Sequence, residues 1–118
     1  LIMKDESHIL DNTPIQKVFE LIKPYQIECI MTNCNQIHTT INSIQSIRKN
    51  WAGKWGTYPN LSKSDYDNEY LTIIDQSDFE NYIEKLCYHK PDVIGLCCGS
   101  TPKHINELTK LTKEIRAI

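Results

Sequence analysis

The sequence has 118 residues, 40% of them hydrophobic and 24% charged, which is enough for one globular domain and too little for two. The formal net charge is -2 and the 13 lysines and arginines are scattered, so the chain shows no basic footprint for nucleic acid. Its longest apolar runs are far shorter than a bilayer span, and we expect no membrane segment.

Strand-like and helix-like segments alternate from the start of the chain. Residues 1–3 are apolar and predict the tail of a strand. A helix is expected to follow, with Thr13 as its N-cap and Pro14 in its first position, and to end at about residue 23. A β-prone run over residues 26–34 predicts the next strand.

The middle of the chain contains a second helix, a strand and a long polar segment. The helix is predicted to end near Asn50, because four isoleucines are spaced to share one helical face: Ile37, Ile41, Ile44 and Ile47. Residues 52–58 predict a third strand. Residues 61–76 predict a loop, which could be an active-site cover or a plain surface excursion.

The last third of the chain predicts two helices around one strand. Ser77 and Glu80 have capping-box spacing, so a helix is expected from there to about residue 90. Residues 92–98 predict a fourth strand, and Thr101 is expected to cap a final helix that has a proline in its first position. This order predicts an α/β fold with parallel strands and right-handed crossovers.

Five cysteines stand at positions 29, 34, 87, 97 and 98. Their odd number argues against a closed disulfide framework, and the α/β pattern indicates a reducing, cytoplasmic compartment. Cys34 and the pair Cys97-Cys98 end two predicted strands, and parallel strands place these ends on one side of the sheet. Three thiolates there would form the protein's share of a catalytic zinc site with one open position. The alternative is buried thiols, which is what we expect of Cys29 and Cys87.

Adjacent cysteines place a condition on such a site. Successive residues of a regular strand point to opposite faces, so Cys97 and Cys98 can reach one ion only if the chain leaves strand geometry there. Gly99 permits that departure.

Residues 95–105 (Gly-Leu-Cys-Cys-Gly-Ser-Thr-Pro-Lys-His-Ile) resemble the Gly-Gly-Cys-Cys-Gly-Thr-Thr-Pro-x-His-Ile signature of the homocysteine S-methyltransferases. Three further segments resemble that family in the same order: residues 10–14 its Asp-Gly-Thr, residues 32–34 its Val-Asn-Cys, and residues 58–60 its Tyr-Pro-Asn. Glycines of the family are replaced here at three positions, namely Asn12, Met31 and Leu96. Of these, Met31 and Leu96 could narrow the pocket.

The resemblance implies a (β/α)8 barrel whose zinc is held by Cys34, Cys97 and Cys98, with the sulfur of homocysteine as the fourth ligand. It implies a methyltransferase that moves a methyl group from a small donor to this sulfur and so makes methionine. By the same resemblance, Asn33, Tyr58 and Asn60 would line the substrate site, although the last two could equally be turn residues that end a strand.

A complete barrel takes about 250 residues. Residues 1–118 are therefore expected to be a single partial domain, the C-terminal half of the barrel from the end of strand five to helix eight. Open strand edges pair readily with another chain, so we expect this piece to need the missing N-terminal half or a second copy, and to be weak or inactive alone. The alternatives are a non-catalytic interaction or relic module with buried thiols, and a redox protein, which would lack the usual Cys-x-x-Cys spacing.

Overall fold

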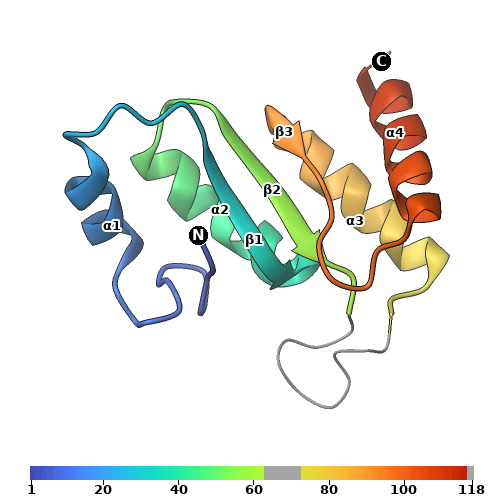
Figure 1. Ribbon diagram of the computed structural model, residues 1–118, viewed down its shortest axis with the longest axis horizontal. Coiled ribbons are helices and arrows are strands. Elements are labelled where there is room, and N and C mark those ends of the chain that lie inside the picture. Colours follow the sequence, from blue (N-terminus) through green and yellow to red (C-terminus); the bar gives the residue numbers. More distant parts are fainter. Residues whose placement is uncertain (63–72, 117–118) are drawn as a thin grey trace.

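The computed structural model describes residues 1–62 and 73–116, with the Arg116 side chain left out. Within these ranges helices and strands alternate along the chain (Figure 1). The helices are α1 (Ile15–Ile22), α2 (Ile37–Asn50), α3 (Gln76–Tyr88) and α4 (Pro102–Arg116). The strands are β1 (Ile30–Gln36), β2 (Trp55–Asn60) and β3 (Val93–Ile94). No helix among the described residues is long and apolar enough to cross a membrane.

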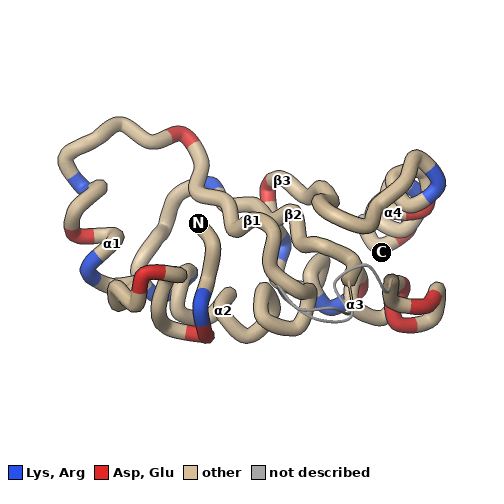
Figure 2. Tube along the Cα trace, turned by 60° about the horizontal axis from the view of Figure 1, so that its bottom comes forward, with Lys and Arg blue, Asp and Glu red and all other residues tan. Residues whose placement is uncertain are grey.

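The strands form one parallel sheet in the order β1-β2-β3, with β2 in the centre. This confirms the predicted α/β fold with parallel strands. Ile30 of β1 is opposite Trp55 of β2, and Gly56 is opposite Val93 of β3. A parallel pair needs a crossover connection, and α2 and α3 supply the two that this sheet uses. Both helices lie on the same side of the sheet (Figure 2).

The face of the sheet toward the helices carries the core. Trp55 packs there with apolar side chains of α2 and α3, and Ile30 packs with α1 and the end of α2. The buried α2 and α3 residues of this cluster are all at most 3% exposed: Ile37, Ile44, Phe79, Ile83 and Leu86. The predicted isoleucine face of α2 is therefore confirmed, since Ile37, Ile44 and Ile47 are buried and Ile41 is packed against them.

The opposite face of the sheet is more open. A Cβ added at Gly56 would lie 2.9 Å from the Cβ of Val93 and 3.1 Å from the terminal methyl of Met31, so these three residues share that face. Val93 is nevertheless 46% exposed. The sheet thus buries its helix-side face more completely than its other face.

Strand β3 is shorter than the predicted strand over residues 92–98. The chain still runs beside β2, because Gly95 N–H donates to the Thr57 carbonyl at 2.9 Å and Cys97 N–H to the Pro59 carbonyl at 2.9 Å. Proline has no N–H to donate in return, so regular pairing ends at Thr57 and Ile94. Because of this proline, the segment that carries the two cysteines is not part of a regular strand.

Two predicted helix starts were wrong in detail. Helix α1 begins at Ile15 with Pro14 as its N-cap, one position later than expected. Helix α3 is capped by Asp75, whose side chain accepts the Asp78 N–H, and Ser77 already lies inside the first turn. Aspartate and serine are equally good caps, so the spacing alone did not distinguish them. Helix α4 begins at Pro102 as predicted.

Residues 1–3 do not form a strand, although Leu1 lies against β1. Its amino group donates to the Met31 carbonyl at 2.6 Å, and its carbonyl accepts the Asn33 N–H at 2.8 Å, which is the bonding of a parallel neighbour. Most of the loop predicted over residues 61–76, and with it the hypothesis of an active-site cover, lies outside the described residues. At its base Ser62 pairs with Ile73.

Replacing Gly56 by alanine should destabilise the chain. The new methyl carbon would lie 2.5 Å from the Val93 carbonyl oxygen, so β2 and β3 would have to separate. We expect the free energy of unfolding to fall by about 1–3 kcal/mol, the usual cost of overpacking, in urea titrations of the 118-residue chain. Gly95→Ala is the control, because its methyl carbon would lie 3.4 Å from the Tyr58 Cβ, an ordinary contact. Equal losses in the two variants would contradict this account.

Candidate metal centre

Cys34 lies at an irregularity of β1. The pairing with β2 shifts register between Asn33 and Gln36. Within this stretch Cys34 has a φ of 59°, a left-handed conformation that residues other than glycine rarely adopt. The predicted strand was expected to end at Cys34, but β1 continues to Gln36 and α2 begins directly after it. The cysteine is therefore presented by a bulge within the strand.

Cys97 and Cys98 lie in the turn that follows β3. The Cys97 carbonyl accepts hydrogen bonds from Ser100 through its N–H at 3.3 Å and its hydroxyl at 2.6 Å. Gly99 has a φ of 80°, and a Cβ there would lie 2.5 Å from the Ile73 side chain. Glycine is thus required at this point, and the chain leaves strand geometry where the sequence analysis said it must.

These two turns bring the thiols together. The Cys34 and Cys97 sulfur atoms are hydrogen-bonded at 2.6 Å, and the Cys97 and Cys98 sulfur atoms are 3.9 Å apart. Both turns lie at the carboxyl ends of parallel strands, on the same side of the sheet. Burial, followed by the hydrogen bond with Cys34, raises the pKa of the Cys97 thiol to about 12.

The donor set was tested against zinc. Zn–S bonds of about 2.3 Å in a tetrahedron separate two thiolates by about 3.8 Å. The Cys97–Cys98 separation agrees with this value, whereas Cys34 and Cys97 are closer. Among the described residues no group of three or more His, Cys, Asp or Glu side chains is already arranged as a metal cage. Chemically, three soft sulfur donors from two turns fit zinc, with room for a further ligand.

Asn60, at the end of β2, is tied to the Cys34 turn. Its side-chain amide donates to the Cys34 carbonyl at 2.9 Å, and its side-chain oxygen accepts the Ser62 hydroxyl at 2.7 Å. Asn60 is 5% exposed and Ser62 3%. Ser62 was not predicted as a site residue. A serine two residues after a buried asparagine is too common a pattern to have indicated it.

The other two predicted substrate residues lie on or beside the open face. Tyr58 is half-buried next to Gly95. Asn33 precedes the Cys34 bulge, and its side-chain oxygen accepts a hydrogen bond from the Leu1 amino group at 3.2 Å. Of the residues that replace family glycines, Met31 extends over Gly56 on this face, whereas Leu96 packs against the helix-side core.

His104 is close to the cysteine turn in sequence, but its ring has a structural role. The Nδ1 atom accepts the Thr101 N–H at 3.1 Å, which completes a capping interaction at the start of α4. The ring also meets Phe79 edge-on, with 5.4 Å between centroids.

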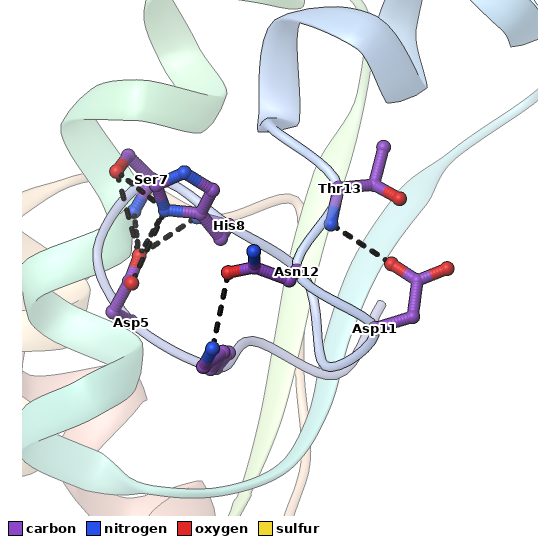
Figure 3. A network of polar contacts seen from close by, with 7 residues as sticks. Asp5, Ser7, His8, Asp11, Asn12 and Thr13 are labelled. Atoms are coloured by element: carbon purple, nitrogen blue, oxygen red, sulfur yellow. Dashed lines mark hydrogen bonds and ion pairs between the residues drawn. The ribbon is translucent and has the colours of Figure 1, made fainter.

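A polar network organises the loop before α1 (Figure 3). The Asp11 carboxylate accepts the Thr13 N–H at 2.9 Å, and the Asn12 side chain accepts a hydrogen bond from Lys4. Asn12 has a φ of 73°. Asparagine is one of the few residues that tolerate this left-handed conformation, so its replacement of the family glycine preserves the turn.

The fold and the thiol cluster together define a parallel α/β chain with a sulfur-rich site at its strand ends. A family model described as homocysteine S-methyltransferase matches residues 1–112. The chain belongs to the homocysteine S-methyltransferase family. No curated protein matches it significantly.

Solved structures similar to this chain include three forms of the homocysteine methyltransferase MmuM from Escherichia coli. The apo form has a TM-score of 0.72 at 22% identity, and the match covers 93% of this chain and 37% of that one. The metallated form has a TM-score of 0.68 at 21% identity over 94% and 33%. The oxidized form has 0.67 at 23% identity over 96% and 33%. The likeness shows the fold, and this chain spans little more than a third of that enzyme's length.

The loop before α1 also contains a strongly acidic carboxyl group, that of Asp5. Asp5 accepts hydrogen bonds from the backbone N–H groups of Ser7 and His8, each at 2.8 Å, and from the His8 ring at 2.9 Å (Figure 3). The Ser7 backbone bond first, and the His8 side chain second, lower the pKa of Asp5 from its ordinary 3.8 to about 2.

Because the pKa of Asp5 is lower in the folded chain, its contribution to stability is present above pH 3.8 and is lost as the pH falls toward 2. We expect NMR titration of the carboxyl carbon to give a midpoint near 2 in the folded chain and the ordinary value in urea. The stability difference between the wild type and Asp5→Asn should shrink over the same pH interval. A folded-state midpoint at the ordinary value would show that the network does not hold the carboxylate.

Proposed function

We propose that this chain is the zinc-binding, C-terminal part of a homocysteine S-methyltransferase, with Cys34, Cys97 and Cys98 as the protein ligands. One observation carries the proposal: thiols 63 positions apart in sequence meet at the carboxyl ends of two parallel strands, with a third thiol beside them. Family membership supports methyl transfer to homocysteine, and the existence of a metallated form of the similar bacterial enzyme supports a metal.

Zinc, when bound, would supply a Lewis acid that keeps a coordinating substrate thiol deprotonated, and hence nucleophilic, near neutral pH. The residues of this chain would hold the metal ion and orient the substrate. Cys34, Cys97 and Cys98 would provide the sulfur ligands, and the Cys34 bulge and the Gly99 turn would present them to the ion. Asn33 and Tyr58 are proposed to contact the substrate from the open face of the sheet. Aligning the thiolate with a small methyl donor is then the remaining requirement.

We further propose that the chain is a single partial domain, equivalent to the C-terminal half of a (β/α)8 barrel. The partly open sheet face, which includes Val93, corresponds to the inside of that barrel, and the helices to its outside. The occupant that fits this face is the preceding part of the barrel, since the similar enzyme has nearly two thirds of its length outside the match. Completion by a second copy is the other outcome that the experiments below distinguish.

Zinc binding is the first test. Anaerobically purified chain should bind one zinc ion, and Cys34→Ser, Cys97→Ser and Cys98→Ser should each lower the affinity at least about 100-fold, because loss of a mere outer-shell partner already costs 10–100-fold. Equilibrium dialysis with a competing chelator measures this. Cys29→Ser is the matched control, since the Cys29 thiol lies before β1 and is directed to the Ile30 carbonyl. If the wild type and all four variants bind alike, the cysteines have no metal role.

Methyl transfer is the second test. The 118-residue chain alone should form no methionine from homocysteine with any of a panel of small methyl donors, because the early strands of the barrel are absent. Co-expression with a chain that carries the preceding β/α units of such a barrel should restore turnover. Sedimentation of the isolated chain gives the control: turnover by a pure monomer would contradict the need for a second part, and turnover by a dimer would identify a second copy as the partner.

A further inference from the structure

We propose that the end of β2, which contains no cysteine, is the element that positions both cysteine turns, and that Asn60 is a positioning residue for Cys34. This inference rests on the proposed zinc site and extends it to residues that do not touch the metal. It follows from hydrogen bonds that join residues 59–61 to the backbone on either side.

The backbone of Cys34 needs support from its neighbours. Its left-handed backbone is unfavourable for a residue with a Cβ and persists only when the surroundings hold it. The Asn60 amide supplies such a hold through its 2.9 Å hydrogen bond to the Cys34 carbonyl. The register places Asn60 opposite Gln36, directly after the bulge, so the bond fastens the irregular stretch to the regular central strand.

The orientation of the Asn60 side chain is set by its two hydrogen-bond partners. A carbonyl can only accept a hydrogen bond, so the NH2 end of the side chain must face Cys34. The oxygen then faces Ser62, whose hydroxyl donates to it at 2.7 Å. Asn60 is 5% exposed, and hydrogen bonds within the chain hold both ends of its side chain amide. Ser62 therefore fixes Asn60, and Asn60 fixes the turn that presents the first thiol.

The other cysteine turn is bonded to the same segment. The Pro59 carbonyl accepts the Cys97 N–H at 2.9 Å, and the Leu61 N–H donates to the Cys98 carbonyl at 2.8 Å. Residues 59–61 are thus bonded to Cys34 on one side and to Cys97 and Cys98 on the other. This segment therefore sets the separation of the two cysteine turns. That separation in turn determines how close the three sulfur atoms can come to one another.

The experiment measures metal affinity and ligand geometry separately from folding. Zinc is added to the metal-free chain, and its affinity is measured by competition with a chelator. Co²⁺ is added in a separate sample, and its absorption spectrum reports the geometry of the ligands. Asn60→Ala should lower zinc affinity about 10–100-fold, as loss of an outer-shell partner does, and should change the cobalt spectrum. Ser62→Ala should give a smaller loss in the same direction, and Ser62→Thr, which keeps the hydroxyl, should restore the wild-type value.

The matched control is Thr57→Val. Thr57 lies in the same strand and is fully buried, and its hydroxyl accepts a 2.8 Å hydrogen bond from the Thr32 hydroxyl. Valine removes this hydrogen bond and leaves the hydrogen bonds to both cysteine turns in place. It should lower the melting temperature of the metal-free chain and leave zinc affinity unchanged. If Asn60→Ala lowers only the melting temperature, the positioning role is overturned while the zinc site stands. Absence of any metal binding by the wild type would overturn both. If Asn60→Ala does not fold, the Ser62→Ala and Ser62→Thr pair decides.

Discussion

The parallel pairing of β2 with a neighbour on each side is the constraint on which the rest of this structure depends. It directs Ile30 and Trp55 toward the helices and Met31 and Gly56 toward the open face, because side chains alternate along each strand. It also places the carboxyl ends of β1 and β3 at the same end of the sheet. Thiols that are distant in sequence meet there as a consequence of strand direction.

Regular pairing alone would not bring the sulfur atoms together, and the chain departs from it at each cysteine turn. Cys34 lies at a register shift with a left-handed backbone, and Gly99 has a positive φ directly after the pair. Pro59 ends the ladder between β2 and β3 because it has no N–H. Irregular backbone held by well-ordered neighbours is typical of sites where side chains must be aimed.

The alternation of strands and helices was predictable from sequence because apolar periodicity and proline positions report on local structure. The meeting of Cys34 with Cys97 followed from the handedness of parallel connections. The bulge at Cys34 was not predictable, since it is a property of how β1 and β2 pair, and one chain's spacing does not contain that register. The role of Asn60 was missed for the same reason: its partner is 26 positions away, across a strand pair. The early end of β3, in contrast, could have been inferred from Pro59 once β2 was placed in the centre.

The distribution of burial also explains how this chain, as the partial barrel domain that we propose, could carry a metal centre. The helix-side core is complete within this chain, with Trp55 at 1% and Ile83 at 0% exposure, whereas Val93 on the other face remains 46% exposed. The cysteine turns are fixed by hydrogen bonds to β2 and by packing on the complete side. The positions of the three cysteines therefore depend on contacts that this chain makes by itself. In the proposed barrel, a substrate pocket on the open face would also need side chains from the part that covers this face.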